Sequence, residues 1–384
     1  MNETPDTIPN PDLAVGDGNK QRWNQPAHRR HGFHHAHRLF RRALMIRSRR
    51  QLLLVQDEDA DLAALPAVEI LTQRPEFSAL VCAKGNRVLL SRHAPDFAPT
   101  QPHSIQSITK LFMHLIAGKL IGDGRLDPGQ TVEHYLPEIG SGYRGAIIQD
   151  VLDMNVMNDF SEDYSDPNAD CYAEEIALGW RLPAEGAPET TLHEFVTNVS
   201  GSDLTNREMT INYCSANTDL LSLICDRLMP GSLPILIADI VDAAGLEYAF
   251  HISLSPEGLP AFSGGGCMSA TDLTRFGLLL ERLIGGHSDA RVGNAGFSQA
   301  ALQRTTKTLK PPRDHVFYAD QFMTNGKWVG HAGYGGQFLM VNTETGMVCS
   351  YLSVLENEAG YCEAYMIETI NLLEMIAGHR PAAD

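Results

Sequence analysis

The chain has 384 residues, of which 43% are hydrophobic and 20% charged, so a large core can form and global disorder is excluded. Its 30 basic and 47 acidic residues give a formal net charge of −17. This charge disfavours nucleic acid as the main partner, because phosphate binding needs a dominant positive face. The length predicts two packed lobes, or one domain with a large insertion.

Cysteine usage and hydropathy indicate the compartment. The seven cysteines are scattered and form no CxxC pair, so we predict neither a disulfide framework nor a zinc site. The first residues have neither the basic stretch nor the apolar run of a secretory signal. The longest apolar helix pattern, at 111–121, is interrupted by His114 and Lys119 and is too short to span a membrane. We therefore expect a cytoplasmic protein with no membrane partner.

The N-terminal segment is unusually basic. Residues 1–22 are predicted to form a disordered tail, and residues 23–60 an arm packed on the body, because Trp23, Phe33 and Leu39 need a partner surface. Residues 20–50 carry Lys20 and nine arginines with no acid, a charge of +10. A nucleic-acid arm, or a metal site at His31 and His35, is the alternative to a basic segment lying across the protein's own acidic surface, which we favour. The histidines of this segment are His28, His31, His34, His35 and His37.

The elements that follow alternate between strand and helix patterns. Residues 77–82 and 87–91 predict a β-hairpin. Residues 105–125 predict a helix, since apolar residues recur there at spacings of three and four. The middle, 130–260, is mostly helical in pattern, and a sharp turn at 263–266 precedes a predicted helix over 270–283. The end predicts strands over 337–342 and 348–355 and a closing helix over about 362–377.

Strands at both ends of the chain with helices between them predict an α+β fold. We expect an antiparallel sheet built from both chain ends and flanked by helices, with an inserted, mostly helical region. In residue numbers, the sheet domain is predicted to comprise 61–130 and 262–384, and the inserted domain 131–261.

Ser107 and Lys110 form the first candidate for chemistry. On a helix, positions i and i+3 share a face, so the hydroxyl and the amine can meet. A serine at a helix start also places its backbone N–H where it can stabilise an oxyanion. The lysine can act as a base only when neutral, and burial or a nearby cation would lower its pKa toward that state. Chance produces this spacing often, so an ordinary helix start is the alternative.

Two further segments could complete a site. Tyr213 precedes a predicted helix, and a phenol near a serine and a lysine can shuttle a proton. The glycine-rich run 330–336, which includes His331 and Tyr334, could admit a substrate closely and supply a second oxyanion donor. Taken alone, each has an ordinary alternative: a packing tyrosine and a bulged strand.

The three segments occur in order, about a hundred residues apart, and this arrangement resembles the SxxK–Tyr–KTG triplet of the serine β-lactamase and penicillin-binding-protein superfamily. Segments 124–127, 135–138, 148–154 and 264–273 look like that superfamily's connecting segments. Within it, the chain is most similar to the 6-aminohexanoate-dimer (nylon-oligomer) hydrolases and their carboxylesterase relatives. The similarity lies in 159–164, 215–219, 330–337 and part of the basic arm.

The resemblance implies a β-lactamase/transpeptidase-like fold and a set of roles. Ser107 would be the nucleophile, Lys110 would activate it and Tyr213 would shuttle the proton, with no metal or cofactor. The N–H groups of Ser107 and Tyr334 would form the oxyanion hole. A histidine stands where the superfamily has lysine, so a switchable cation replaces a permanent one. The residues expected to bind substrate are His331, Gly333, Ser215, Asn217 and Tyr164, with Ser215 and Asn217 sharing the role of the superfamily's asparagine.

An acidic loop precedes the tyrosine motif. It could hold an amino group of the substrate, with Tyr164 closing over the acyl part, as the resemblance implies. For each single carboxylate we favour a solvated loop, or a partner for the arginines of the arm. The loop's acids are Asp159, Glu162, Asp163, Asp166 and Asp170.

These observations predict a serine hydrolase that cleaves amide or ester bonds of a small molecule through an acyl-enzyme. Short peptide amides, nylon-like oligomers and small esters all fit. The alternatives are an acyltransferase or carboxylesterase on the same fold and, from another class, a non-catalytic binding protein with a retired site. A nucleic-acid binder using residues 20–50 is the least favoured alternative.

Overall fold

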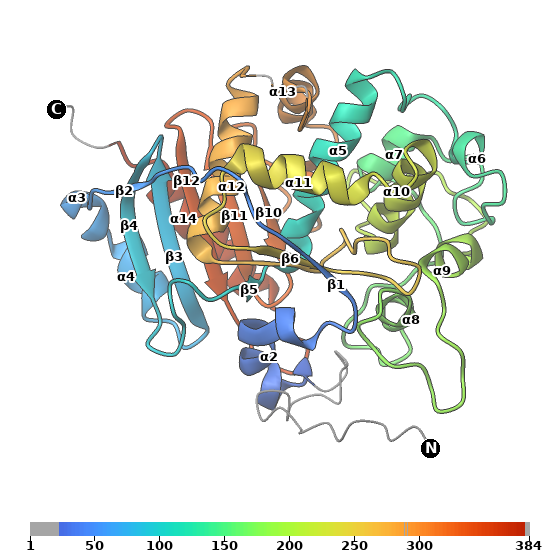
Figure 1. The fold of residues 1–384 in the computed structure, drawn as a ribbon, viewed down its shortest axis with the longest axis horizontal. Helices are drawn as coiled ribbons and strands as arrows, with labels where there is room; N and C mark the ends of the chain where they lie inside the picture. Colours follow the sequence, from blue (N-terminus) through green and yellow to red (C-terminus); the bar gives the residue numbers. More distant parts are fainter. Residues whose placement is uncertain (1–22, 288, 290, 381–384) are drawn as a thin grey trace.

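The protein is described by a computed structural model that covers residues 23–380 except 288 and 290 (Figure 1). The predicted tail, 1–22, lies outside the described residues. Within them, strands from both ends of the chain meet in one sheet, and helices from the middle gather on one side of the molecule (Figure 1).

The main sheet has eight strands in the order β2-β4-β3-β12-β11-β10-β9-β8. β2 runs parallel to β4, and every other neighbouring pair is antiparallel. The predicted fold, an antiparallel sheet built from both chain ends, is therefore confirmed apart from the short strand β2. The strands are β2 (Val55–Gln56), β3 (Phe77–Lys84), β4 (Arg87–His93), β8 (Phe317–Ala319), β9 (Phe322–Thr324), β10 (Trp328–Gly333), β11 (Gln337–Asn342) and β12 (Met347–Ser353).

Helices cover the two faces of this sheet. α12 (Ala270–Ile284) packs on β3, β11 and β12, and Gly277 in this helix leaves room for Val348, since an added Cβ would lie 2.4 Å from that side chain. α14 (Glu363–Ala377) contacts β11 and β12, and α4 (Pro66–Thr72) packs against α14 and β3. In Figure 1, α12 lies in front of the strands and α14 behind them.

A second, four-stranded sheet was not predicted. Its order is β1-β6-β7-β5, and all its pairs are antiparallel. Its strands have only two to four residues, too few for an alternating pattern to stand out in a sequence. They are β1 (Ala43–Ile46), β5 (His103–Ser104), β6 (Phe250–Ser253) and β7 (Gly266–Met268).

The predicted helix over 105–125 is two elements. Residues Gln106–Thr109 form a 3₁₀ turn, η2, and α5 (Lys110–Gly122) follows it directly. α5 is apolar on nearly all sides, as expected for a helix inside the core. Phe112 in α5 stacks between Phe250 and Phe276, with ring centroids 4.5 and 4.6 Å apart. The start of α5 is therefore held rigidly by the core.

The middle of the chain is mostly helical. Between β7 and β8, α12 is followed by α13 (Ala295–Gln303), which contacts α5. No single helix of the described residues is long and apolar enough to cross a bilayer, although the bent pair α10–α11 passes on length and composition alone. The helices of the middle segment are α6 (Val132–Tyr135), α7 (Ile148–Leu152), α8 (Asp170–Ala177), α9 (Leu192–Asn198), α10 (Ser215–Leu228) and α11 (Leu233–Ala244).

The basic arm lies against the body. Its helix α2 (Pro26–Leu39) contacts β5, and Phe33 at its centre is fully buried. Arginines of the arm form ion pairs with acidic residues of the body, as Arg30 does with Asp96 at 2.6 Å. Further pairs join Arg41 and Arg42 to Glu189, and Arg49 to Asp242. These contacts are those of a basic segment lying on the protein's own acidic surface.

Candidate active site

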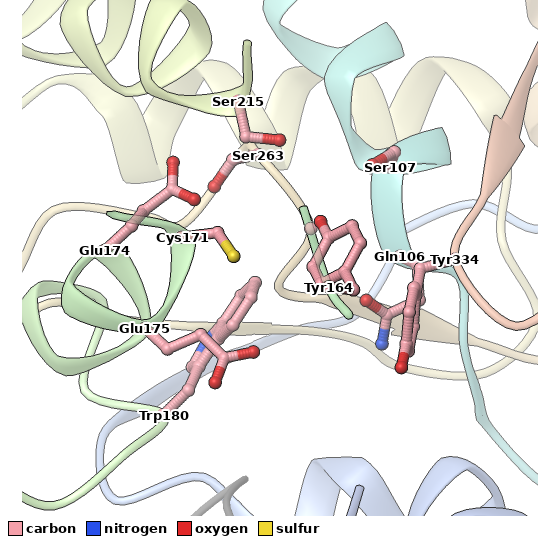
Figure 2. A pocket seen from close by; sticks show the side chains of 11 residues that line it. Gln106, Ser107, Tyr164, Cys171, Glu174, Glu175, Trp180, Ser215, Ser263 and Tyr334 are labelled. Carbon is pink, nitrogen blue, oxygen red and sulfur yellow. The ribbon is translucent and has the colours of Figure 1, made fainter. Parts of the chain in front are cut away.

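A pocket lies where η2, α8, α10 and the end of β10 meet (Figure 2). Ser107 enters it from η2, two glutamates come from α8, and a tyrosine comes from the turn after β10. The full lining is Gln106, Ser107, Tyr164, Cys171, Glu174, Glu175, Trp180, Ser215, Ser263, Gly264 and Tyr334.

Ser107 and Lys110 are in contact, as their spacing predicts. The Lys110 Nζ lies 3.2 Å from the Ser107 Oγ. It also donates to the Ser215 Oγ at 3.0 Å and to the carbonyl oxygen of Ser263 at 2.7 Å. Gln106, just before the serine, has a φ of 49°, a conformation that costs energy for a residue with a side chain. This strained residue starts the turn that presents Ser107 to the pocket.

The charge of Lys110 differs from the expectation. Burial acts to lower its pKa, but Tyr213, Glu162 and Glu174 together outweigh burial, and the pKa of Lys110 is raised. The three oxygens around its Nζ match the three N–H donors of an ammonium group. Lys110 is therefore a protonated ammonium at neutral pH, and the predicted neutral amine is wrong for the ground state. Sequence reasoning counted the burial and not the Glu162 carboxylate that the acidic loop places beside Ser215.

Tyr213 joins the same cluster. The Lys110 Nζ lies 5.1 Å from the centre of the Tyr213 ring. Burial raises the pKa of Tyr213, and the charge of Lys110 only partly opposes the rise. The phenol is thus protonated at neutral pH and can donate a proton.

Glu162 is a residue of the acidic loop whose place the sequence did not single out. Its carboxylate accepts hydrogen bonds from the Ser215 backbone N–H at 2.7 Å and the Ser215 hydroxyl at 2.8 Å. The Tyr164 hydroxyl donates to the same carboxylate at 2.7 Å. A chain of contacts therefore runs from Lys110 through the Ser215 hydroxyl to Glu162. The only sequence signal for Glu162 was its position in an acid-rich loop.

The other acids of that loop serve local turns. Asp159 accepts from the Ser200 hydroxyl, Asp163 from Ser165, Asp166 from the Asn168 backbone and Asp170 from the Ser161 backbone. These contacts agree with the structural interpretation that the sequence favoured for each single carboxylate. Tyr164 lines the pocket, with its ring centroid 4.8 Å from that of Tyr334.

Two buried carboxyls interact at the pocket wall: Glu174 lines the pocket, and Asp219 is not part of the lining. Burial raises the pKa of Glu174 far above its ordinary value, and neighbouring Asp219 and Glu162 add to the rise. Burial also raises the pKa of Asp219, to about 6. The raised pKa of Glu174 favours its neutral form, whereas Glu175 beside it is paired with Arg181 at 2.9 Å. The acidic wall in Figure 2 thus carries less negative charge than its composition suggests.

Tyr334 and Gly333 lie at the end of β10. Tyr334 lines the pocket on the same side as Ser107, below it in Figure 2. Gly333 pairs with Gln337 in β11, and an added Cβ would lie only 2.6 Å from the carbonyl oxygen of Ile105. The missing side chain therefore lets β10 approach the turn that carries Ser107. Gly333 itself is not part of the pocket lining.

His331 and Asn217, two of the residues expected to bind substrate, are not part of the pocket lining. His331 is fully buried, with Nε2 3.2 Å from the Tyr318 hydroxyl and Nδ1 2.6 Å from the carbonyl oxygen of Ala332. Burial lowers the pKa of His331 to about 3, so it is no switchable cation at neutral pH. Asn217 is also fully buried, and its Oδ1 accepts from the Tyr143 hydroxyl at 3.0 Å. Ser215 and Asn217 were expected to share the role of the superfamily's asparagine, and of these two only Ser215 lines the pocket.

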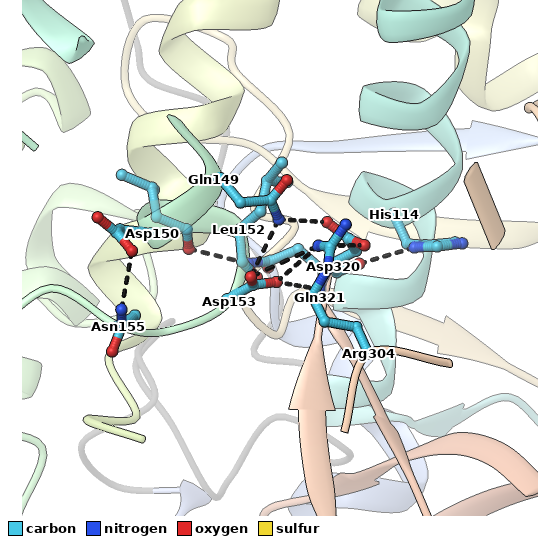
Figure 3. A network of polar contacts seen from close by, with 10 residues as sticks. His114, Gln149, Asp150, Leu152, Asp153, Asn155, Arg304, Asp320 and Gln321 are labelled. Atoms are coloured by element: carbon cyan, nitrogen blue, oxygen red, sulfur yellow. Dashed lines mark hydrogen bonds and ion pairs between the residues drawn. The ribbon is translucent and has the colours of Figure 1, made fainter. Parts of the chain in front are cut away.

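A buried polar network connects the elements behind the site (Figure 3). Asp320 and Gln321, the turn between β8 and β9, both have a positive φ. Asp320 pairs with Arg304 at 2.8 Å, and its carbonyl oxygen lies 2.7 Å from His114 of α5. The Gln321 side chain accepts from Thr218 of α10 at 2.6 Å. One turn therefore contacts both the helix that carries Lys110 and the helix that carries Ser215.

Comparison with known proteins places the chain in a family. The model of the family described as Beta-lactamase matches residues 68–364. The 6-aminohexanoate-dimer hydrolase of Paenarthrobacter ureafaciens is 31% identical over 302 residues, which are 76% of this chain and 74% of that protein.

Solved structures share the fold. A putative 6-aminohexanoate-dimer hydrolase from Bacillus anthracis superposes with a TM-score of 0.80 at 16% identity, over 97% of this chain and 98% of that one. EstCE1, described as a hydrolase with promiscuous acyltransferase activity, gives a TM-score of 0.61 at 15% identity, over 81% and 98% of the two chains. The resemblance inferred from the motifs is thus confirmed, and the chain belongs to the Beta-lactamase family as a hydrolase of that fold.

Proposed function

We propose that this hydrolase cleaves amide or ester bonds of small substrates through an acyl-enzyme formed on Ser107. The observation that carries the proposal is the contact of the Lys110 Nζ with the hydroxyl of Ser107, a residue of the pocket lining, next to the Tyr213 ring. A nucleophile in contact with a base and a second proton carrier is what acyl transfer needs. The 31% identity to a 6-aminohexanoate-dimer hydrolase supports an amide among the substrates.

Nucleophile activation requires that Lys110 first lose a proton. The contacts offer a route, because the ammonium donates to the Ser215 hydroxyl, which donates to Glu162. When Lys110 passes a proton to Ser215 and Ser215 passes its own to Glu162, the result is a neutral amine, an intact serine and a protonated Glu162. The neutral Lys110 then accepts the Ser107 proton as the Ser107 Oγ attacks the substrate carbonyl.

The remaining steps use the same groups. The backbone N–H groups of Ser107 and Tyr334 bind the oxyanion of the tetrahedral intermediate. Tyr213 gives its proton to the leaving nitrogen or oxygen as the bond to the carbonyl carbon breaks, and it is reprotonated by Lys110. A water then attacks the acyl-enzyme, loses a proton to the same groups and releases the acid, with Ser107 restored.

The pocket favours an uncharged acyl group. Its lining contains no arginine, histidine or lysine side chain among the described residues. A substrate carboxylate would find no cation there apart from Lys110 behind Ser107. With the neutral form of Glu174 favoured and Glu175 paired, a neutral chain can lie against Tyr164 and Trp180.

Labelling by a serine-directed aryl phosphonate tests the proposal. Intact mass should show one phosphonyl group on the wild type and none on Ser107→Ala, because the nucleophile is gone. Undiminished labelling of Ser107→Ala, or no labelling of the wild type, would contradict the proposal, and the latter would favour a binding protein with a retired site. Product analysis with an added amine separates hydrolysis from acyl transfer.

Replacing Glu162 with glutamine tests the proton route. Without the carboxylate, Lys110 can lose its proton only to solvent, so kcat for a chromogenic acyl ester should fall by about 10- to 100-fold at pH 7. Loss of the Glu162 charge also removes one cause of the raised pKa of Lys110, so the loss in kcat should shrink as the pH rises and solvent deprotonates Lys110. Steady-state rates from pH 6 to 10 measure this. Asp163→Asn, in the same loop, is the control and should leave kcat unchanged; an equal loss at every pH would refute the route.

A further inference from the structure

Arg29 of α2 holds a loop of the distant C-terminal region. Its guanidinium is buried and donates to the carbonyl oxygens of Leu355 at 2.8 Å, Asn357 at 2.6 Å and Glu358 at 3.3 Å. Its Nε donates to Asn24 at 3.0 Å. A charged donor shared among several carbonyls fixes their relative positions, because charge-assisted hydrogen bonds are the strong ones.

The loop held by Arg29 is bonded to the turn that contains Tyr334. The Leu355 N–H donates to the Gly335 carbonyl oxygen at 2.9 Å, and the Gly335 N–H donates to the Gly360 carbonyl oxygen at 3.1 Å. Gly360 leaves room for the Tyr334 hydroxyl, because an added Cβ would lie 2.2 Å from that oxygen. The turn after β10 is thus fixed to the loop on both sides of Gly335.

α2 also touches the turn directly. The Arg29 guanidinium lies 5.7 Å from the centre of the Tyr334 ring, within the range of a cation–π contact. The Phe33 ring, one helical turn further on, lies 6.1 Å from that of Tyr334. An added Cβ on Gly335 would meet Phe33 at 2.4 Å, so the helix and the turn are closely packed.

We propose that Arg29 is a positioning residue that aims the Tyr334 N–H at the oxyanion, through the loop 355–360 and the face of α2. The inference rests on the proposed function, in which that N–H stabilises the tetrahedral intermediate. It assigns the basic arm a part in the reaction although no residue of the arm lines the pocket. Loss of an oxyanion donor costs about 10²- to 10³-fold in kcat, so a misaimed donor should cost less, about 10- to 50-fold.

Arg30 provides a matched control. It is the next residue of the same helix and likewise donates to backbone carbonyls, those of Pro75 at 3.3 Å, Glu76 at 3.4 Å and Phe77 at 2.8 Å, and to Asp96. It therefore fastens α2 to the body at β3 and not at the Tyr334 turn. Arg30→Ala should weaken the docking of the arm and lower the melting temperature while leaving kcat unchanged.

The experiment compares full-length Arg29→Ala, Arg29→Lys and Arg30→Ala with the wild type. We expect Arg29→Ala to lower kcat for a chromogenic acyl ester and the phosphonate labelling rate at Ser107 by about 10- to 50-fold, with KM changed less than threefold. Added methylguanidinium should restore part of the rate in Arg29→Ala and none in Arg30→Ala. Arg29→Lys, which keeps the charge and reaches fewer carbonyls, should lie between.

The outcomes separate the two proposals. Labelling of the wild type at Ser107 together with equal rates in Arg29→Ala and Arg30→Ala would overturn the inference and leave the proposed function standing. No labelling of the wild type would overturn both. If Arg29→Ala fails to fold, Arg29→Lys serves as the test. A lysine cannot bond all three carbonyls of Leu355, Asn357 and Glu358, so a wild-type kcat in Arg29→Lys would refute the positioning role.

Discussion

Replacing Lys110 with methionine is expected to lower kcat for a chromogenic acyl ester by on the order of 10³-fold. The change removes the amine that contacts the Ser107 and Ser215 hydroxyls and keeps a side chain of similar length in a fully buried place. Without that amine, Ser107 has no base to accept its proton during attack on the substrate. Steady-state kinetics and the phosphonate labelling rate should fall together.

The control for this prediction lies on the same helix. Lys119 of α5 pairs with Asp123 at 2.9 Å, four residues on. Lys119→Met should change kcat less than twofold. A Lys110→Met enzyme that retains more than a tenth of the wild-type rate, with an unchanged melting temperature, would contradict the assignment of Lys110 as the activating base.

Acid is expected to detach the arm from the body. Burial lowers the pKa of His34 to about 2 and that of His37 to about 3, with smaller contributions from neighbouring charges. Both histidines lie on α2: His34 packs against Ser78, Phe97 and His103, and His37 faces His251. Released into water, each would regain a pKa near 6.5.

The direction of the pH effect on docking follows from the lowered pKa values of His34 and His37. Above about pH 6.5 both histidines are neutral in either state, and the docking of α2 is at full strength. As the pH falls below 6.5, His34 and His37 become protonated in the released arm, whereas in the docked arm they stay neutral until pH 3 or below. Each histidine then costs about 1.4 kcal/mol of docking free energy per pH unit. Two of them raise the opening equilibrium about 100-fold per pH unit.

Hydrogen exchange of the α2 amides from pH 7 to 4.5, corrected for intrinsic rates, measures this opening. The double variant His34→Asn, His37→Asn should lose most of the pH dependence, whereas His134→Asn, at an exposed histidine of α6, should keep it. Arg30 and Asp96 face His34 as well, but the lowered pKa of Asp96 keeps that carboxylate charged through this window. Protection of α2 that does not change down to pH 4.5 would refute the prediction.

Much of the fold follows from local sequence signals. The β-rich runs at 77–82 and 87–91 lie within β3 and β4, which pair as the predicted hairpin, and the strand predicted at 337–342 is β11 with the same bounds. The turn between β8 and β9 was not predicted, because Asp320 and Gln321 adopt positive φ and the sequence has no glycine there to indicate such a turn. Their conformation is held by Arg304 and by the backbone of α7, which are contacts that no local pattern encodes.

The candidate site, too, could be predicted from the sequence only in part. The spacing of Ser107 and Lys110 and the order of the motifs suffice to bring these residues and Tyr213 together as a hypothesis. The structure has Ser107 and Lys110 in contact, with the Lys110 Nζ 5.1 Å from the centre of the Tyr213 ring. The charge of Lys110 could not be read in advance, because it depends on how Glu162 folds back beneath Ser215. Likewise, Asn217 and Ser215 are two residues apart at a helix start, and only the packing of α10 decides which one faces the pocket.

The order of the strands has a consequence for synthesis. β3 pairs on one edge with β4, which follows at once, and on the other with β12, whose first residue is made 263 residues after the last of β3 (347 − 84). At about 5–20 residues per second, a ribosome needs roughly 13–50 s to supply that partner. Until then a nearly all-buried strand presents an open edge to other nascent chains, a template for aggregation that the finished molecule no longer has.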